Sequence, residues 1–202
     1  MHPVLLELFG LKINTYGFMI AMGFLSAMWL GSRLFREIGL NPEKFVDIAF
    51  WSLVSGILGA RGLYIITRWD SFASNPLSIL YIWEGGLVFF GGLIVAGIFD
   101  ILYIRKQKLP FWKTVDILSM AVVTGHAFGR IGCFFAGCCH GKATESFLGI
   151  KFFSDLVDPA LQGISVHPTQ LYESFSITLK TFFISFDSPT KSPVGNFTLG
   201  AE

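Results

Sequence analysis

The stretch KFVDIAFWSLVSGILGAR, residues 44–61, recurs in outline 69 residues later as KTVDILSMAVVTGHAFGR, residues 113–130. Both copies carry an aspartate near the start, Asp47 or Asp116, and end on an arginine, Arg61 or Arg130. The same shift superimposes small residues of the preceding segments: Gly17 on Gly86, Gly23 on Gly92 and Ala27 on Ala96. Apolar helices share residues by chance, but chance explains the match of both polar ends poorly. The pattern predicts two similar helical hairpins, a common plan in membrane proteins.

Composition places the chain in a membrane. Of its 202 residues, 52% are hydrophobic and only 14% are charged, and the mean hydropathy is +0.61. Soluble domains carry about 25% charged residues. The net charge of +1 argues against a nucleic-acid partner, because nucleic-acid binders normally present a dominant basic face. We therefore expect an integral membrane protein with no nucleic-acid ligand.

Four apolar spans have about the 20 residues that cross a bilayer: 16–35, 45–67, 86–104 and 112–135. A fifth span at 171–186 is weaker, because Glu173 and Lys180 interrupt it. The predicted fold class is all-α, a polytopic helical membrane protein with four strong spans and a weak fifth. Residues 1–180 are expected to form the transmembrane domain, and residues 181–202 an atypical, poorly ordered tail.

Basic residues in the loops predict the orientation. They gather between spans one and two (Arg33, Arg36, Lys44) and between spans three and four (Arg105, Lys106, Lys108, Lys113), whereas the loop between spans two and three offers mainly Arg68. Both basic loops are therefore expected in the cytoplasm. The N-terminus and residues 137–168 are then expected at the outer face.

The repeated arginines lie at an unusual depth. Fourteen residues separate Asp47 from Arg61 and Asp116 from Arg130, which is about 21 Å along a helix. With each aspartate at the cytoplasmic boundary, each arginine lies within the outer leaflet, where a charge costs about 2.5–3.5 kcal/mol. Such residues usually line a polar cavity, and two arginines at equal depth are suited to clamping one anion.

Arg130 opens the segment GRIGCFFAGCCHG, residues 129–141. Gly129 and Gly132 beside it permit close backbone approach, and a guanidinium forms a bidentate fork suited to phosphate. We interpret Arg130 as a ligand of a phospholipid phosphate, with Arg61 as a weaker second candidate. The alternative is a structural ion pair of Arg130, with Glu84, Glu145 or Glu173 as the partner.

The three cysteines of this segment favour no metal site. Their spacing, Cys-x₄-Cys-Cys-His, differs from the paired Cys-x₂₋₄-Cys pattern of zinc sites, and adjacent ligands are not expected to point at one ion. A redox pair is open at the outer face, although the chain has no Cys-x-x-Cys. Taken singly, each thiol is best interpreted as a small packing residue. We expect no metal and no cofactor.

Two further segments contribute candidate residues. The pairs Gly85–Gly86 and Gly91–Gly92 bracket LVFF, and tight helix packing is their favoured physical interpretation. The segment HPTQLYE, residues 167–173, groups four polar side chains at a membrane entrance: His167, Gln170, Tyr172 and Glu173. For this second group a binding or catalytic site is as good an interpretation as a polar anchor with an aromatic belt residue.

In this order, TYGFMIAMGFLSAMWLG, GARGLYI, WEGGLVFFGGLI, GRIGCFFAGCCHG and HPTQLYE resemble the bacterial prolipoprotein diacylglyceryl transferases, over roughly residues 13–180. The resemblance implies a multi-pass enzyme of the bacterial inner membrane, normally with seven spans. It implies transfer of the diacylglyceryl group of phosphatidylglycerol to the lipobox cysteine of a prolipoprotein, with release of glycerol phosphate. The implied partners are phosphatidylglycerol, the lipobox of the signal peptide and the bilayer.

The resemblance also implies roles for single residues. Tyr16 matches the family's tyrosine in the first span, and Arg130 matches the arginine that holds the lipid phosphate. The remaining signature matches are Gly129, Gly132, Phe134 and Gly141. The chain departs from the family at Cys133, Ala136 and Cys138, where Asn, Asn and Glu are common. It also departs at Phe90, where many relatives have a histidine proposed as a base. The candidate bases that remain are His140, His167 and Glu173.

The implied mechanism is an alkyl transfer, in which a thiolate attacks C3 of the glycerol and phosphate leaves. Arg130 is expected to be the principal phosphate clamp, with Arg61 assisting. Beyond about residue 180 the resemblance stops, and we expect a truncated or frameshifted member of the family. The alternatives are a non-catalytic phospholipid-binding membrane protein and a small transporter, which the repeat and the glycine-broken helices would suit.

Overall fold

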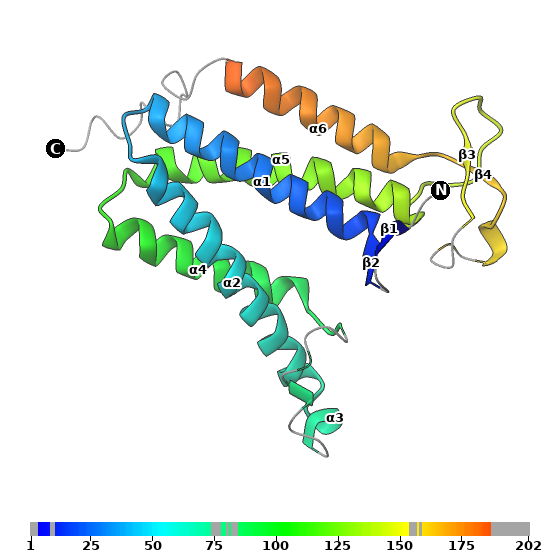
Figure 1. Ribbon diagram of the computed structural model, residues 1–202, viewed down its shortest axis with the longest axis horizontal. Coiled ribbons are helices and arrows are strands. Elements are labelled where there is room, and N and C mark those ends of the chain that lie inside the picture. Colours follow the sequence, from blue (N-terminus) through cyan, green and yellow to red (C-terminus); the bar gives the residue numbers. More distant parts are fainter. Residues whose placement is uncertain are drawn as a thin grey trace.

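The computed structural model describes residues 4–8, 11–73, 78–79, 81, 85–153, 157 and 159–186. The helices are α1 (Thr15–Glu37), α2 (Pro42–Thr67), α3 (Trp69–Ala73), α4 (Phe89–Lys106), α5 (Phe111–Ala136) and α6 (Thr169–Phe186), with a short 3₁₀ turn η3 (Pro159–Leu161). The strands are β1 (Val4–Leu8) paired with β2 (Leu11–Asn14), and β3 (Ile150–Lys151) paired with β4 (Ser165–Val166), both antiparallel. Figure 1 shows the long helices as the body of the molecule.

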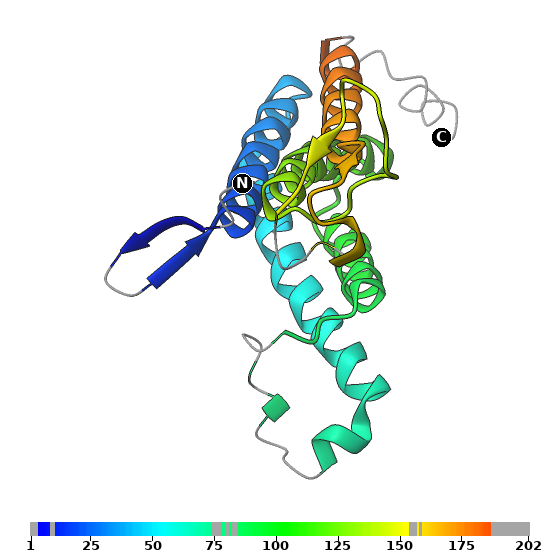
Figure 2. The ribbon, with the colours of Figure 1, turned by 90° about the vertical axis from the view of Figure 1, so that its right-hand side faces the viewer.

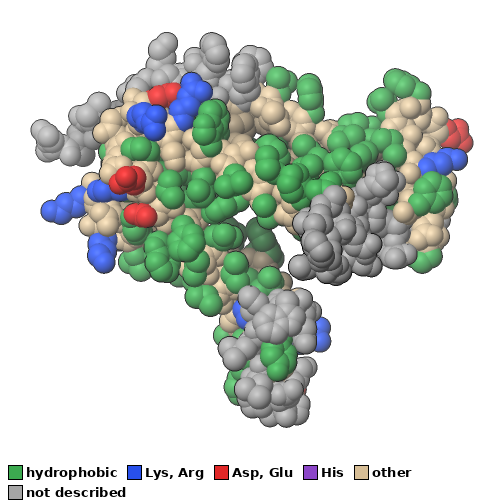
Figure 3. Space-filling view, viewed as in Figure 1, with side chains coloured by type: hydrophobic (Ala, Val, Ile, Leu, Met, Phe, Trp, Pro, Cys, Tyr) green, Lys and Arg blue, Asp and Glu red, His purple; other side chains and the backbone are tan. Residues whose placement is uncertain are grey.

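The helices confirm the predicted fold class. Within the described residues, α1, α2 and α5 are each long and apolar enough to cross a membrane. Helix α4 falls short of that standard because Asp100, Arg105 and Lys106 lie within its 18 residues. Large apolar side chains face outward, as on Leu58 and Val122, which are 66% and 69% exposed. Hydrophobic side chains cover most of the visible helix surface in Figure 3, as expected for a lipid-facing protein.

Local sequence explains where the helices begin and end. At the start of α2, the Asn41 side chain accepts a hydrogen bond of 2.9 Å from the Glu43 amide, and Pro42 occupies the first turn, a favoured N-terminal arrangement. Helix α4 begins three residues later than the span expected at 86–104, because Gly85 and Gly86 have φ values of +87° and +76°. Residues with such φ values cannot continue a right-handed helix.

Two limbs make up the helical body. One contains α1, α5 and α6, the other contains α2 and α4, and the limbs diverge from one end (Figure 1). At the joined end a buried core, which includes Phe35, Phe45, Ile104 and Ile117, links α1, α2, α4 and α5. The two basic loops lie at this same end, where Figure 3 shows charged side chains gathered at the left. We call it the basic end.

The internal repeat is visible in the packing. Helices α2 and α5 begin and end at positions exactly one repeat length apart, and so do the last residues of α1 and α4. Helix α1 packs along α5, while α4 packs along α2. A Cβ on Gly23 would lie 3.0 Å from the Gly125 carbonyl oxygen, and a Cβ on Gly92 would lie 2.8 Å from that of Gly56. These two contacts are equivalent under the 69-residue shift.

The repeat is thus confirmed, with one refinement. The two helices of each predicted hairpin make fewer contacts with each other than with helices of the other hairpin: α1 takes its main partner from the second repeat, and α2 does likewise. Exchanging the two repeats maps one tight pair onto the other. Glycines at equivalent positions let the backbones of each pair, α1 with α5 and α4 with α2, approach closely.

Two small β-structures lie beyond the ends of the helices. Figure 2 shows the β1–β2 hairpin projecting away from the helical body. The β3–β4 ladder belongs to the connection between α5 and α6 and packs Phe152 and Val166 into a second, small core. This core fixes the connection against Phe134 of α5. The boundary predicted at residue 180 falls inside α6, which continues to Phe186, and residues 187–202 lie outside the described part of the chain.

Candidate functional site

The candidate site lies at the end of the first limb that is opposite the basic end. There the start of α1, the end of α5 and the start of α6 come together. A Cβ on Gly132 would lie 3.1 Å from Tyr16 Cδ2 and 3.2 Å from Met19 Cβ, so this glycine lets α1 rest against α5. Gly129 is less demanding, since its nearest neighbour is Ile20 at 3.6 Å. Tyr16 and Gly132, which were both predicted as site residues, are therefore in contact.

Arg130 faces α6. Its Nη2 donates a hydrogen bond of 2.7 Å to Glu173 Oε1, and its Nε lies 2.7 Å from Glu173 Oε2. The second contact is close, but its N–H direction does not suit a hydrogen bond, which leaves Nε as a buried donor without an acceptor among the described residues. The arginine side chain is 16% exposed and the glutamate 48%. Glu173 is one of the three carboxylates named above as alternative partners of Arg130.

Arg61 has a different environment although it is the repeat equivalent of Arg130. Its three nitrogens donate to five backbone carbonyls: Ser78, Ile79, Tyr81, Gly85 and Gly86. A guanidinium has five N–H donors, so all of them are engaged. The side chain is buried and lies against the rings of Tyr64 and Phe72. Arg61 therefore anchors the loop before α4. In this structure its guanidinium has no N–H left to donate to a phosphate, as its expected assisting role would require.

The predicted glycine pairs have structural roles. Gly85 and Gly86 present their carbonyls to Arg61, and a Cβ on Gly86 would clash with the Tyr64 ring. Gly91 and Gly92 instead abut α2, where a Cβ would lie 2.5 Å and 2.8 Å from backbone oxygens. The contacts of Gly91 and Gly92 agree with the helix-packing interpretation. Gly85 and Gly86 have a different role, because their carbonyls help Arg61 to anchor the loop.

Helix α5 ends in a tight turn that carries the cysteines. The amides of Gly137 and Cys138 donate back to the carbonyls of Phe134 and Cys133, at 3.2 Å and 3.1 Å, and Gly137 has a φ of +80°. This is the Schellman arrangement that glycine favours at a helix C-terminus. Cys139 also has a positive φ of +62°. The Sγ atoms of Cys133, Cys138 and Cys139 consequently lie within 4.8 Å of one another.

Burial, followed by repulsion from Cys133, raises the pKa of the Cys138 thiol to about 12. Because the three Sγ atoms lie so close together, adjacent Cys138 and Cys139 do bring their thiols to one place, contrary to the expectation from their spacing. Cys139 has a left-handed backbone conformation, which residue spacing alone does not reveal.

Residues of HPTQLYE hold this turn in place. Gln170 is fully buried and its Nε2 donates 2.7 Å to the Cys138 carbonyl, while its Oε1 has no hydrogen-bond partner among the described residues. The Thr169 hydroxyl donates to the Cys139 carbonyl at 3.1 Å. Gly141 donates its amide to the His167 carbonyl at 2.8 Å, where a Cβ would lie 2.8 Å from Thr169. Gln170 and Gly141 thus join the start of α6 to the end of α5.

The candidate bases are dispersed. His167 Nδ1 lies 3.3 Å from the Tyr172 hydroxyl, and His140 Nδ1 lies 3.1 Å from the Gly141 carbonyl oxygen, with its ring stacked on Phe152. Glu173 is engaged by Arg130. Phe90 is exposed near the start of α4, on the other limb. Tyr16 lies within electrostatic range of all three cysteines.

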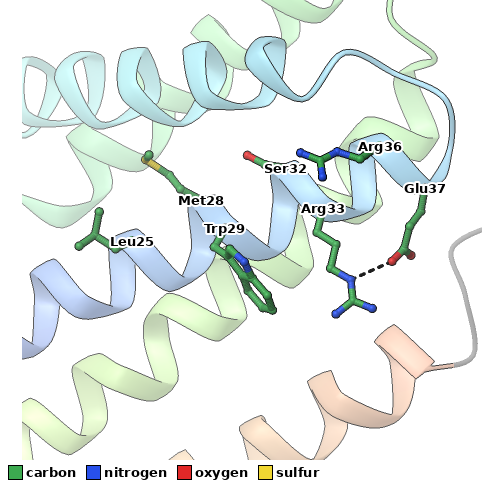
Figure 4. A pocket seen from close by; sticks show the side chains of 7 residues that line it. All are labelled: Leu25, Met28, Trp29, Ser32, Arg33, Arg36 and Glu37. Atoms are coloured by element: carbon green, nitrogen blue, oxygen red, sulfur yellow. Dashed lines mark hydrogen bonds and ion pairs between the residues drawn. The ribbon is translucent and has the colours of Figure 1, made fainter.

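A pocket of about 640 Å³ lies elsewhere, toward the basic end of α1. Its lining residues all belong to α1: Leu25, Met28, Trp29, Ser32, Arg33, Arg36 and Glu37 (Figure 4). Arg33 pairs with Glu37 at 2.9 Å and lies over the Trp29 ring. None of the predicted site residues lines this pocket, so its size is no evidence about the chemistry at Arg130.

Comparison with known proteins agrees with this geometry. A family model described as prolipoprotein diacylglyceryl transferase matches residues 3–199. The chain belongs to this family. The prolipoprotein diacylglyceryl transferase match extends beyond the 13–180 range in which the sequence motifs were apparent.

Several curated relatives are named phosphatidylglycerol–prolipoprotein diacylglyceryl transferase. The Clostridium tetani protein is 40% identical over 184 residues, covering 91% of this chain and 73% of the relative. A Clostridium perfringens protein, whose name carries the number 2, is 36% identical over 192 residues, covering 95% and 74%. The Synechocystis protein is 34% identical over 205 aligned residues, covering 97% and 72%. This chain therefore spans about three quarters of the length of these relatives.

Proposed function

We propose that this protein transfers the diacylglyceryl group of phosphatidylglycerol to the lipobox cysteine thiol of a prolipoprotein and releases glycerol phosphate. Family membership supports the reaction class, and the single observation that carries the site assignment is the environment of Arg130. Its guanidinium is largely buried near the end of α5, and Glu173, the carboxylate that pairs with it at 2.7 Å, is half exposed. A buried guanidinium needs a partner of opposite charge, and a lipid phosphate can share or replace the half-exposed carboxylate as that partner.

Charge explains how Arg130 would promote the transfer. The thiolate sulfur of the substrate attacks C3 of the glycerol, the C–O bond to phosphate breaks, and the electron pair leaves with the phosphate. A fixed guanidinium stabilises the negative charge that builds on the departing oxygen. Glu173 keeps the guanidinium in place before the lipid arrives, and its contact with Arg130 is the one that a phosphate would replace or share.

The proposed setting is the bacterial inner membrane. The two basic loops at one end support a cytoplasmic location for that end by the positive-inside rule. The N-terminus, Arg130 and the α5–α6 connection are then at the outer face, where a signal peptide with its lipobox is accessible. The bilayer supplies phosphatidylglycerol from the side.

The test uses the full chain in lipid nanodiscs that contain phosphatidylglycerol, with a lipobox peptide as the acceptor. Arg130→Ala is expected to abolish glycerol phosphate release and peptide lipidation while leaving helix content and insertion intact. Arg33→Ala is the control, because Arg33 also pairs with a glutamate, Glu37, but at an exposed position at the basic end of α1. Full activity of Arg130→Ala would refute the assignment.

A second function has a specific observation in its favour. The Glu173 carboxylate against Arg130 offsets the positive charge that would stabilise a departing phosphate, which suits headgroup binding without transfer. Binding of phosphatidylglycerol to the full chain, with no glycerol phosphate released in the presence of the peptide, would support this non-catalytic alternative.

A further inference from the structure

Three thiol groups lie close together near Arg130. Cys133 comes from the last turn of α5, and Cys138 and Cys139 come from the turn that follows it. Their Sγ atoms all lie within 4.8 Å of one another. Cys139 is exposed, whereas Cys133 and Cys138 are half-buried. The cluster is thus accessible on one side and covered on the other.

The backbone around this cluster is held in a fixed conformation. Cys139 adopts a φ of +62°, which non-glycine residues adopt rarely, and this conformation brings adjacent thiols to the same side. Gln170 and Thr169 of α6 bind the carbonyls of Cys138 and Cys139, at 2.7 Å and 3.1 Å. Side chains that merely fill space do not require such a conformation or such anchoring.

We propose that Cys133, Cys138 and Cys139 form a three-thiolate site for a soft divalent cation of the zinc class, with a fourth coordination position open. Thiolates are preferred ligands of such ions. A Zn–S distance of about 2.3 Å places tetrahedral sulfurs about 3.8 Å apart, so the thiols need to close by no more than about 1 Å. No fourth acidic or histidine ligand joins the cluster among the described residues.

His140 does not supply the fourth ligand. Its Nδ1 lies 3.1 Å from the Gly141 carbonyl oxygen, and its ring is stacked on Phe152 at a centroid distance of 5.6 Å. Sites with three protein ligands and an open position are those at which zinc takes part in a reaction. Closed four-ligand sites are structural.

The open position suits the substrate of the proposed reaction, and this step rests on the proposed function. A thiol that coordinates such an ion is deprotonated, and the thiolate is the nucleophile. The lipobox thiol would release its proton to solvent on binding. Its sulfur would then form the bond to glycerol C3 as the C–O bond to phosphate breaks, and the neutral thioether, a weaker ligand than a thiolate, would leave the metal.

Arg130 lies in the right place for this step. It precedes Cys133 by three residues on α5, and residues three apart share a helix face. The attacking sulfur and the departing phosphate would therefore be held side by side, one by the metal and one by the guanidinium. This arrangement also provides thiol activation without a dedicated protein base.

Metal binding is tested first, without reference to activity. The full chain in detergent micelles is reduced, stripped with a chelator and titrated with Co²⁺ or Zn²⁺. We expect one ion per chain and a cobalt–thiolate charge-transfer band. Cys139→Ser, at an exposed position, and Cys138→Ser should each weaken binding by about a hundredfold or more, since loss of an outer partner alone costs ~10–100-fold. His140→Ala should bind as the unaltered protein does.

Two results would overturn the metal site. One is a reduced protein whose three thiols can all be alkylated but which takes up neither ion. The other is a cobalt band that persists when all three cysteines are replaced by serine.

The substrate role is tested with the cobalt-loaded protein. A lipobox peptide is expected to intensify the thiolate band, whereas the same peptide with serine in place of cysteine should not. Chelation should lower glycerol phosphate release by about tenfold or more, and Zn²⁺ should restore it. Full activity after complete metal removal would overturn this inference and leave the proposed function standing. A metal-loaded protein that transfers nothing would refute the proposed function instead.

Discussion

Arg130 and Glu173 join the end of α5 to the start of α6 through a hydrogen bond of 2.7 Å and an ion contact of 2.7 Å. The two residues are 43 positions apart in the chain. The carboxylate occupies the guanidinium that the proposed function assigns to a lipid phosphate, so lipid binding at Arg130 would compete with the α5–α6 contact.

The first prediction concerns Glu173→Gln. The amide removes the negative charge that competes with phosphate, so we expect a short-chain phosphatidylglycerol to bind more tightly. Because the glutamate is half exposed, its ion pair is worth at most about 1 kcal/mol, which limits the gain to about fivefold. Binding is measured in zwitterionic nanodiscs by calorimetry. Glu37→Gln removes the carboxylate of the Arg33 pair and should change nothing. Weaker lipid binding by Glu173→Gln would show that the carboxylate chiefly positions Arg130.

The second prediction concerns the helix contacts that the repeat creates. In Gly92→Ala the new Cβ would lie 2.8 Å from the Gly56 carbonyl oxygen, so α2 and α4 must separate, at a cost of about 1–3 kcal/mol. Gly97→Ala is the matched control, because nothing lies within 4 Å of its Cβ position on the same helix. Thermal unfolding in detergent should show a lower midpoint for Gly92→Ala and an unchanged or higher one for Gly97→Ala. Equal midpoints would contradict the packing.

The third prediction concerns Arg61→Lys. Lysine keeps the charge but has three donors in place of five, so at least two loop carbonyls lose their partners. Because hydrogen bonds to charged groups contribute about 1.5–3 kcal/mol each, we expect the loop before α4 to open. Limited proteolysis and amide exchange at residues 78–86 measure this. Phosphatidylglycerol affinity should not change, and a large loss of affinity would restore Arg61 as a lipid ligand.

The fourth prediction concerns the thiol of Cys138. Burial penalises the thiolate, and the neighbouring Cys133 adds to this, so the pKa rises from an ordinary 9.0 to about 12. In metal-free protein the alkylation rate of Cys138 should therefore keep rising with pH past 9, about tenfold per pH unit, instead of levelling off. A short peptide with the same residues should level off near 9. A plateau near 9 in the folded protein would contradict the burial of this thiol. Mass spectrometry of the labelled fragment provides the rate.

The sequence predicted the helices well because their signals are local. The spans 45–67 and 112–135 became α2 and α5 with boundary shifts of at most three residues, since Asn41 marks the start of α2 and Gly137 the end of α5 through nearby contacts. The 69-residue repeat also aligned Gly23 with Gly92 and Gly56 with Gly125, and the structure shows these glycines in equivalent contacts. The pairing of α1 with α5 and of α2 with α4 was not predictable in this way. A sequence repeat shows which segments are equivalent, but it does not show which helices pack against each other.

The site was predictable only in part, for a similar reason. Tyr16, Gly132 and Arg130 do lie together, and Glu173 was among the expected partners of Arg130. The role of Arg61 was missed because its acceptors are backbone carbonyls of a loop, which have no signature in the sequence. The thiol cluster was missed because it depends on the φ of Cys139. Neither the β1–β2 hairpin nor the Gln170 contact to Cys138 has a strong local signal.

The swapped pairing of α1 with α5 has a consequence for biosynthesis. The Gly23–Gly125 contact joins segments about a hundred residues apart, so the first span emerges from the ribosome long before its partner exists. Until the fourth span is inserted, α1 has only lipid, the insertion machinery or a chaperone to cover its glycine face. Assembly of the first limb must therefore be post-insertional, and a nascent chain halted before α5 should be a substrate for membrane quality-control proteases.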